Sequence, residues 1–129
     1  MKAQTILGAC ALLALSAAPS TAQTSTLSAG AIAFTGYQSD TPDTWSFVLL
    51  DPVASETKIF FTDNGWTTAG AFRANEGTAE WEATENLPSG VQITISGTTV
   101  SIRGSTKSAG TVSSNSVALS ASGDQLLAY

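Results

Sequence analysis

The sequence predicts an all-β fold, an antiparallel β-sandwich of about eight short strands. Three observations lead to this prediction. Short runs of β-branched and aromatic residues recur about every eight to thirteen residues. Turn-forming Gly, Pro and Asn-Gly sequences separate these runs, and no segment has the roughly 3.6-residue periodicity of an amphipathic helix. In about a hundred residues this pattern favours two packed sheets of immunoglobulin-like type, with a small closed barrel as the alternative.

The expected strands follow one another along the chain at 31–37, 44–50, 56–62, 78–84, 91–96, 99–103, 116–120 and 125–129. In 91–96 and 99–103 apolar and polar residues alternate, so each of these strands has one face toward solvent. We expect the two to form a hairpin, because Gly97 between them can take the positive φ of a tight turn. Residues 105–115, which are rich in Ser, Thr and Gly, are expected to form a loop or a ragged edge.

Two further turns are expected, at 88–90 and at 63–65. Pro88 presets φ for the first turn. In the second, the pair Asn64-Gly65 tolerates left-handed φ.

The start of the chain has the features of a signal peptide. Lys2 supplies a positive charge, residues 6–15 are apolar but too short to span a bilayer, and small residues precede a cleavage position after Ala22. We therefore expect residues 1–22 to be removed on export, either to the periplasm or out of the cell. A lipoprotein box ending at Cys10 is the alternative, but it lies too close to the N-terminus. Residues 23–30 are then a flexible leading segment, and residues 31–129 are the β-sandwich domain.

Composition narrows the functional classes. Removing 22 of the 129 residues leaves 107, enough for one domain, and takes away the only cysteine, so the mature chain has no disulfide. Four basic residues then face ten acidic ones, a formal charge of −6 that disfavours nucleic acid and attracts divalent cations. After the leader, no apolar run reaches membrane-spanning length and no Asn-x-Ser/Thr glycosylation acceptor occurs.

Several short motifs together resemble a known family. They are Phe61-Thr62-Asp63-Asn64-Gly65-Trp66, Ala71-Phe72-Arg73, Glu76-Gly77-Thr78, Trp81 and Leu119-Ser120-Ala121-Ser122-Gly123-Asp124-Gln125-Leu126. With these motifs, about residues 30–129 resemble a domain of bacterial secreted and surface proteins that has a lamin-tail-like, immunoglobulin-type sandwich. The resemblance implies a non-catalytic module of longer extracellular proteins, beside hydrolase or sorting domains, whose own ligand is generally unassigned. Such relatives run on past the position of Tyr129, so either the last strand closes the sheet or the chain is a piece of a longer protein.

The residue types limit the chemistry. Without histidine or a mature cysteine, the chain lacks Ser-His-Asp and Cys-His catalysis and His-ligated zinc. Glu80 and Glu82 would share one face of a strand, with Trp81 on the other. Their spacing of roughly 6–7 Å along a strand approaches that of an inverting glycosidase pair. The alternative is a solvated acidic face, which Glu76 and Glu85 extend.

Oxygen-bearing side chains predict a candidate Ca²⁺ site. Asp40 and Asp43 flank one loop, Asp63 and Asn64 lie in another, and Asp124 precedes the last strand. Ca²⁺ takes about six to eight oxygen ligands and tolerates irregular loops, so these side chains could bind it if the loops meet at one end of the sandwich. The alternative is that they form turns by bonding to the backbone.

The tryptophans suggest a platform on which sugar rings stack. Trp45 occupies alternate positions with Phe47 and Leu49, and Trp81 lies opposite the acidic face, so both tryptophans are expected in the core. Trp66, after the Asn-Gly pair, is the one expected at the surface, with packing as the alternative role. Tyr37 is a further candidate for such a platform.

These observations favour a non-enzymatic exported β-sandwich module for adhesion, ligand binding or structural spacing, with Ca²⁺ as a candidate stabilising ion. The expected partner is an extracellular ligand or surface, with polysaccharide as one candidate, and neither nucleic acid nor a membrane span is expected. One alternative is an N-terminal accessory domain, or a fragment, of a longer extracellular hydrolase. A carboxylate-based glycosidase is the other.

Overall fold

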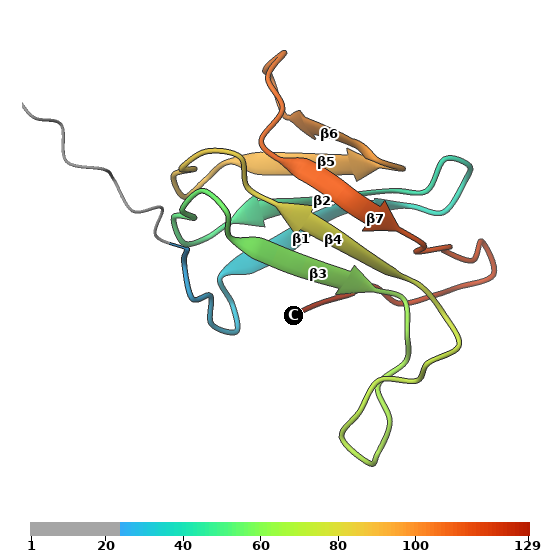
Figure 1. Ribbon diagram of the computed structural model, residues 1–129. Helices are drawn as coiled ribbons and strands as arrows, with labels where there is room; N and C mark the ends of the chain where they lie inside the picture. The colour runs from blue at the N-terminus through green and yellow to red at the C-terminus, as the bar shows by residue number, and fades with distance from the viewer. Residues whose placement is uncertain (1–23) are drawn as a thin grey trace, which may run out of the picture.

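The computed structural model describes residues 24–129, so the predicted signal peptide, residues 1–22, lies outside the described residues. Two antiparallel four-stranded sheets pack face to face, and none of the described residues forms a helix (Figure 1). The prediction of an all-β antiparallel sandwich is confirmed. The barrel alternative is wrong, because the strands form two separate sheets. No helix in the described part of the chain is long and apolar enough to cross a membrane.

The strand order differs between the two sheets. The first sheet has the order β1 (Ile32–Gln38), β2 (Thr44–Leu49), β5 (Gln92–Ser96) and β6 (Thr99–Ile102). The second sheet has the order β7 (Thr111–Asn115), β4 (Thr78–Glu82), β3 (Lys58–Thr62) and β8 (Leu127–Ala128). Among the strands that the structure describes, β1 and β6 are the edges of the first sheet, and β7 and β8 are the edges of the second.

The core consists of alternate residues on the inner strands. On β2, Trp45 and Phe47 are fully buried, as are Ile93 and Ile95 on the neighbouring β5. Across the sandwich, the ring of Phe47 lies 5.7 Å from that of the fully buried Trp81 of β4. The period-two pattern thus identified the buried face of these strands, because successive side chains of a strand point to opposite faces.

The predicted hairpin is confirmed. Strands β5 and β6 pair antiparallel with Ser96 opposite Thr99, which leaves a two-residue turn. Gly97, the first residue of this turn, has φ +57°. Glycine takes this backbone conformation without steric cost, which is the reason that it fits there.

The seventh strand is not where the sequence predicted it. The expected strand at 116–120 is wrong, and β7 lies at Thr111–Asn115, inside the segment expected to be a loop. Val117 and Leu119 are buried at alternate positions, which produced the strand-like pattern. The amides of Ala118 and Leu119, however, donate to aspartate side chains instead of a neighbouring strand. As an edge strand, β7 packs only Val112 against the core, so its sequence has no period-two signal.

The two long sides of the sandwich differ. On one side β6 lies beside β7, and the side-chain amide of Asn115 donates to the carbonyl of Gly97 in the opposite sheet at 2.6 Å. On the other side no Cα atom of β1 lies within 8 Å of a Cα atom of β8. The sandwich is therefore closed along β6 and β7 and open between the described strands β1 and β8.

Candidate functional site

Asp63, one of the predicted calcium ligands, is a buried carboxylate at the end of β3. Only 1% of it is exposed. One oxygen accepts a hydrogen bond from the Gly77 amide at 2.6 Å, and the other accepts one from the Ala118 amide at 2.9 Å. Both oxygens therefore hold backbone segments that are distant in sequence.

Asp43 has the same kind of role as Asp63, although it adjoins the other sheet. It directly precedes β2, and its carboxylate accepts the Leu119 amide at 2.7 Å. Since Ala118 and Leu119 are consecutive, the structure brings these two predicted ligands together around one backbone segment. They fasten that segment to both sheets.

Asn64 extends this polar network into the connection between β3 and β4. Its side-chain amide donates to the Thr62 hydroxyl at 2.9 Å and to the Gly77 carbonyl at 3.1 Å. Its side-chain oxygen accepts the Glu76 amide at 3.0 Å. Neither Asn64 nor Gly65 has a positive φ, so the tight turn expected here is wrong. The side chain of Asn64 instead ties together the two ends of a longer connection.

Asp124 and Asp40 lie apart from this network. Asp124 accepts hydrogen bonds from the amides of Ser120 and Gln125 at 3.0 and 2.8 Å, which closes its own local turn. Asp40 is exposed. Within residues 24–129, no group of three or more His, Cys, Asp or Glu side chains is placed to hold a metal ion. The calcium site stays a prediction, and hydrogen bonds to the backbone account for Asp43, Asp63 and Asp124.

The acidic face predicted on β4 is formed by Glu80 and Glu82. The Lys58 ammonium lies 2.5 Å from a carboxylate oxygen of Glu80 and 3.5 Å from one of Glu82. The hydrogen bond and the negative charge of Glu80 raise the pKa of Lys58 above its ordinary value of 10.5. Trp81 between the two glutamates is fully buried, as predicted. Neither glutamate lines the cavity beside Ile32 and Phe34 or the one beside Val53 and Leu87. Catalysis by this pair would need a cleft around it, so the glycosidase alternative stays a prediction.

Four aromatic rings form a continuous row on the outside of the second sheet. We call this row the aromatic strip; it consists of Trp66, Phe72, Tyr129 and Phe60. Trp66 meets Phe72 edge to face at 4.9 Å, and Phe72 lies 4.9 Å from Tyr129. Tyr129 in turn stacks on Phe60 at 5.6 Å. Trp66 and Tyr129 are 58% and 57% exposed, so the strip is a solvent-facing apolar surface.

Backbone pairing holds the strip in place. The connection between β3 and β4 extends away from the sandwich (Figure 1), and within it Trp66 and Phe72 form an isolated β-bridge. At the base of this arm the Arg73 amide donates to the Gly65 carbonyl at 2.8 Å. At the other end of the strip, the amides of Phe60 and Tyr129 each donate to the carbonyl of the other, at 3.0 and 2.9 Å.

The sequence predicted one member of the strip. Trp66 is at the surface, and Trp45 is in the core together with Trp81, as expected. Tyr37 is half-exposed on β1, in the other sheet, and does not belong to the strip. Phe60, Phe72 and Tyr129 were missed, because strand pairing brings them together from distant parts of the chain.

Comparison with known proteins identifies no relative: no protein-family model, no curated protein and no solved structure matches the chain.

Proposed function

We propose that the protein is an exported, non-enzymatic β-sandwich module that binds an extracellular polysaccharide through the aromatic strip. The observation that carries this proposal is the continuous row of rings with Trp66 and Tyr129 more than half exposed. Exposed apolar surface of this kind is usually an interaction site. The flat faces of Trp and Tyr can stack on the C–H faces of sugar rings, while their polar atoms stay hydrated.

Charge indicates which polysaccharides fit. Glu80 stands opposite Phe60 in the strand pair, so its carboxylate borders the strip. Carboxylates accept hydrogen bonds from sugar hydroxyls. The formal charge of −6 after loss of the leader repels polyanions. An uncharged polymer is therefore the favoured ligand.

The export part of the proposal depends on the signal peptide pattern of residues 1–22. The motifs that resemble lamin-tail-like modules support the same setting, a secreted protein in which this domain is not the catalytic unit. As an accessory domain of a longer extracellular hydrolase, the module would hold its neighbour on the polymer.

The test is co-sedimentation of the purified protein with insoluble cellulose and chitin, with affinity electrophoresis in soluble alginate as the anionic comparison. We expect binding to a neutral polymer and none to alginate. Trp66→Ala should weaken binding about tenfold, equivalent to about 1.4 kcal/mol, and leave the melting temperature within about 2 °C.

Leu50→Ala is the matched control, because Leu50 is a similarly exposed apolar residue, 52% accessible, away from the strip. It should bind like the parent protein. Failure of the parent to bind either neutral polymer would overturn the proposal, and so would unchanged binding by Trp66→Ala.

A further inference from the structure

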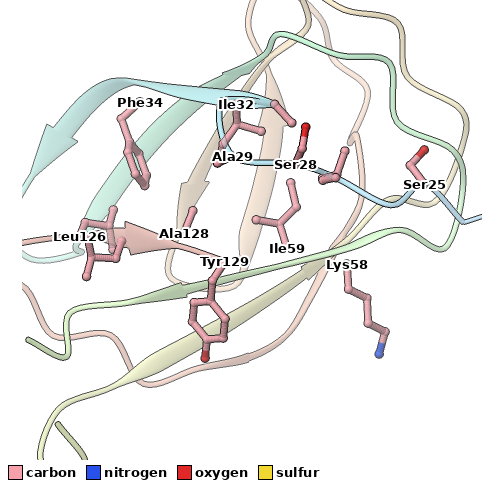
Figure 2. A pocket seen from close by; sticks show the side chains of 14 residues that line it. Ser25, Ser28, Ala29, Ile32, Phe34, Lys58, Ile59, Leu126, Ala128 and Tyr129 are labelled. Carbon is pink, nitrogen blue, oxygen red and sulfur yellow. The ribbon is translucent and has the colours of Figure 1, made fainter. Parts of the chain in front are cut away.

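A second surface, independent of the aromatic strip, lies on the open side of the sandwich. There a groove of about 730 Å³ separates β1 from β8. Figure 2 shows Phe34 of β1 pointing down toward Leu126, with Ile59 and Ala128 farther along the groove. The ring of Tyr129 points to the other side of the second sheet, toward the strip. The groove is therefore lined mainly by apolar side chains.

Part of the β1 backbone along the rim of this groove has no hydrogen-bond partner among residues 24–129. The Leu50 amide donates to the Ala31 carbonyl at 2.8 Å, so these residues form a hydrogen-bonded pair. Such pairs alternate with non-hydrogen-bonded pairs in an antiparallel ladder. Ala33 therefore faces β2, whereas Ile32 and Phe34 turn their N–H and C=O groups away from it. Outside the ladders, no backbone hydrogen bond among residues 24–129 uses these groups.

The same two residues combine both requirements of strand addition. Ile32 and Phe34 offer, in the plane of the sheet, backbone groups that pair with nothing in the described part of the chain, and their side chains line the groove. Phe34 is 42% exposed although it stands opposite the fully buried Phe47. One more strand beside β1 would cover Phe34 as β2 covers its other side.

The first half of β1 carries none of the features that usually protect an edge strand. Exposed edge strands usually carry Lys, Pro or an inward-pointing charge that prevents pairing with another chain. β1 contains no charged residue and no proline. A bulge between Phe34 and Gly36 ends its regular part, so the free edge extends over the first half of the strand.

Charge at the ends of β1 identifies the kind of partner. Asp51 lies beside the start of β1, where its amide donates to the Ala31 carbonyl at 3.3 Å. Asp40 follows the end of β1. Both are exposed. Lys58, the basic residue of the groove, is already paired with Glu80. An extended segment with basic residues therefore complements this edge better than an acidic one.

A second copy of the chain fits less well. Each copy carries a formal charge of −6 without its leader, so two copies repel each other.

We propose that β1 is a docking edge for an extended peptide segment of another protein, with apolar side chains at alternate positions and basic residues between them. The segment pairs with Ile32 and Phe34 as a fifth strand of the first sheet and places its apolar side chains in the groove. Main-chain hydrogen bonds provide affinity in this mode of recognition, and the groove provides selectivity.

The test uses a synthetic peptide as long as β1 that alternates valine and lysine and has blocked ends. Amide hydrogen exchange is followed by NMR. Without peptide, the amides of Ile32 and Phe34 should exchange faster than that of Ala33. With millimolar peptide, exchange at Ile32 and Phe34 should slow at least tenfold. The same peptide with alternate amides N-methylated should have no such effect, because it keeps the side chains but loses the donors.

Phe34→Asp should weaken binding of the peptide at least tenfold, whereas Leu50→Ala should bind the peptide as the parent protein does. The proposal is overturned if the peptide slows neither amide, or if the methylated peptide acts equally well. If amide exchange at Ile32 and Phe34 slows without peptide when only the protein concentration is raised, β1 pairs with β1 of a second copy, and the proposal is overturned. Cellulose and chitin binding should be unaffected by Phe34→Asp, so this test is separate from that of the aromatic strip.

Discussion

Asp43 and Asp63 accept hydrogen bonds from two consecutive backbone amides, those of Leu119 and Ala118, although one aspartate precedes β2 and the other follows β3. The two carboxylates thus join the first sheet to the second through one short segment of chain. This segment carries Val117 and Leu119 into the core without forming a strand. Charge-assisted bonds of this type are stronger than neutral ones, which suits a position with no strand ladder.

Asp63→Ala should be strongly destabilising, because it leaves the buried Gly77 amide and the Ala118 amide without their acceptor. We expect the free energy of unfolding to fall by about 2–5 kcal/mol. Urea denaturation measures this change. Asp40→Ala is the matched control, since Asp40 is exposed, and it should stay within about 0.5 kcal/mol of the parent. A similar stability of both variants would contradict a structural role for Asp63.

Gly77→Ala tests the close approach of two segments. A Cβ atom at Gly77 would overlap the carbonyl of Ser116, a backbone group that cannot move aside alone. We expect a loss of about 2–3 kcal/mol in thermal or urea unfolding. Gly65→Ala provides the comparison, because its Cβ would meet the movable side-chain amide of Gln125 at 3.0 Å. If Gly77→Ala proves no more harmful than Gly65→Ala, the close packing at Ser116 is not needed for stability.

Addition of Ca²⁺ distinguishes a metal site from a self-sufficient hydrogen-bond network. The carboxylates of Asp43, Asp63 and Asp124 already accept backbone amides. We therefore expect the melting temperature to be the same in millimolar CaCl₂ and in EDTA. A ligand present at about a hundred times its Kd would add about 2.7 kcal/mol to the stability, which a melting curve detects. A rise with Ca²⁺ that EDTA reverses would establish the calcium site predicted from the sequence.

Lys58 predicts a specific pH dependence. Its pKa in the folded protein lies above 10.5, chiefly because of the hydrogen bond and charge of Glu80. A raised pKa means that the ion pair contributes to stability below pH 10.5 and that this contribution is lost as the pH rises through the folded pKa. NMR titration of the Lys58 ammonium should show a larger fall of the pKa in Glu80→Gln than in Glu82→Gln. Equal effects of the two variants would contradict the assignment of Glu80 as the main partner.

Much of the fold could be read from local patterns. The alternation of Trp45, Phe47 and Leu49 with less apolar residues predicted which face of β2 is buried, and all three are fully buried. The position of Gly97 likewise predicted the β5–β6 hairpin. The sequence did not predict edge strand β7, because a strand that packs a single side chain against the core needs no repeating apolar pattern.

The candidate sites were harder to predict. Asp63 and Asn64 have the residue types of a turn, and their types alone do not reveal that Asp63 accepts an amide 55 residues away. Trp66 could be expected at the surface, but the strip around it includes Phe60 and Tyr129, which meet only because the end of the described chain pairs with β3.

The sequence by itself therefore determined the all-β class, the inward faces of the inner strands and the exclusion of histidine chemistry. Each of these depends on residue type or on the two-residue period of a strand, which consecutive residues express. Only the tertiary structure decided the order of the strands, the hydrogen-bond partners of the aspartates, the aromatic strip and the open edge of β1. These features depend on hydrogen bonds and ring contacts between distant segments, and the partner of such a contact is selected by sheet order and register, which no single segment contains.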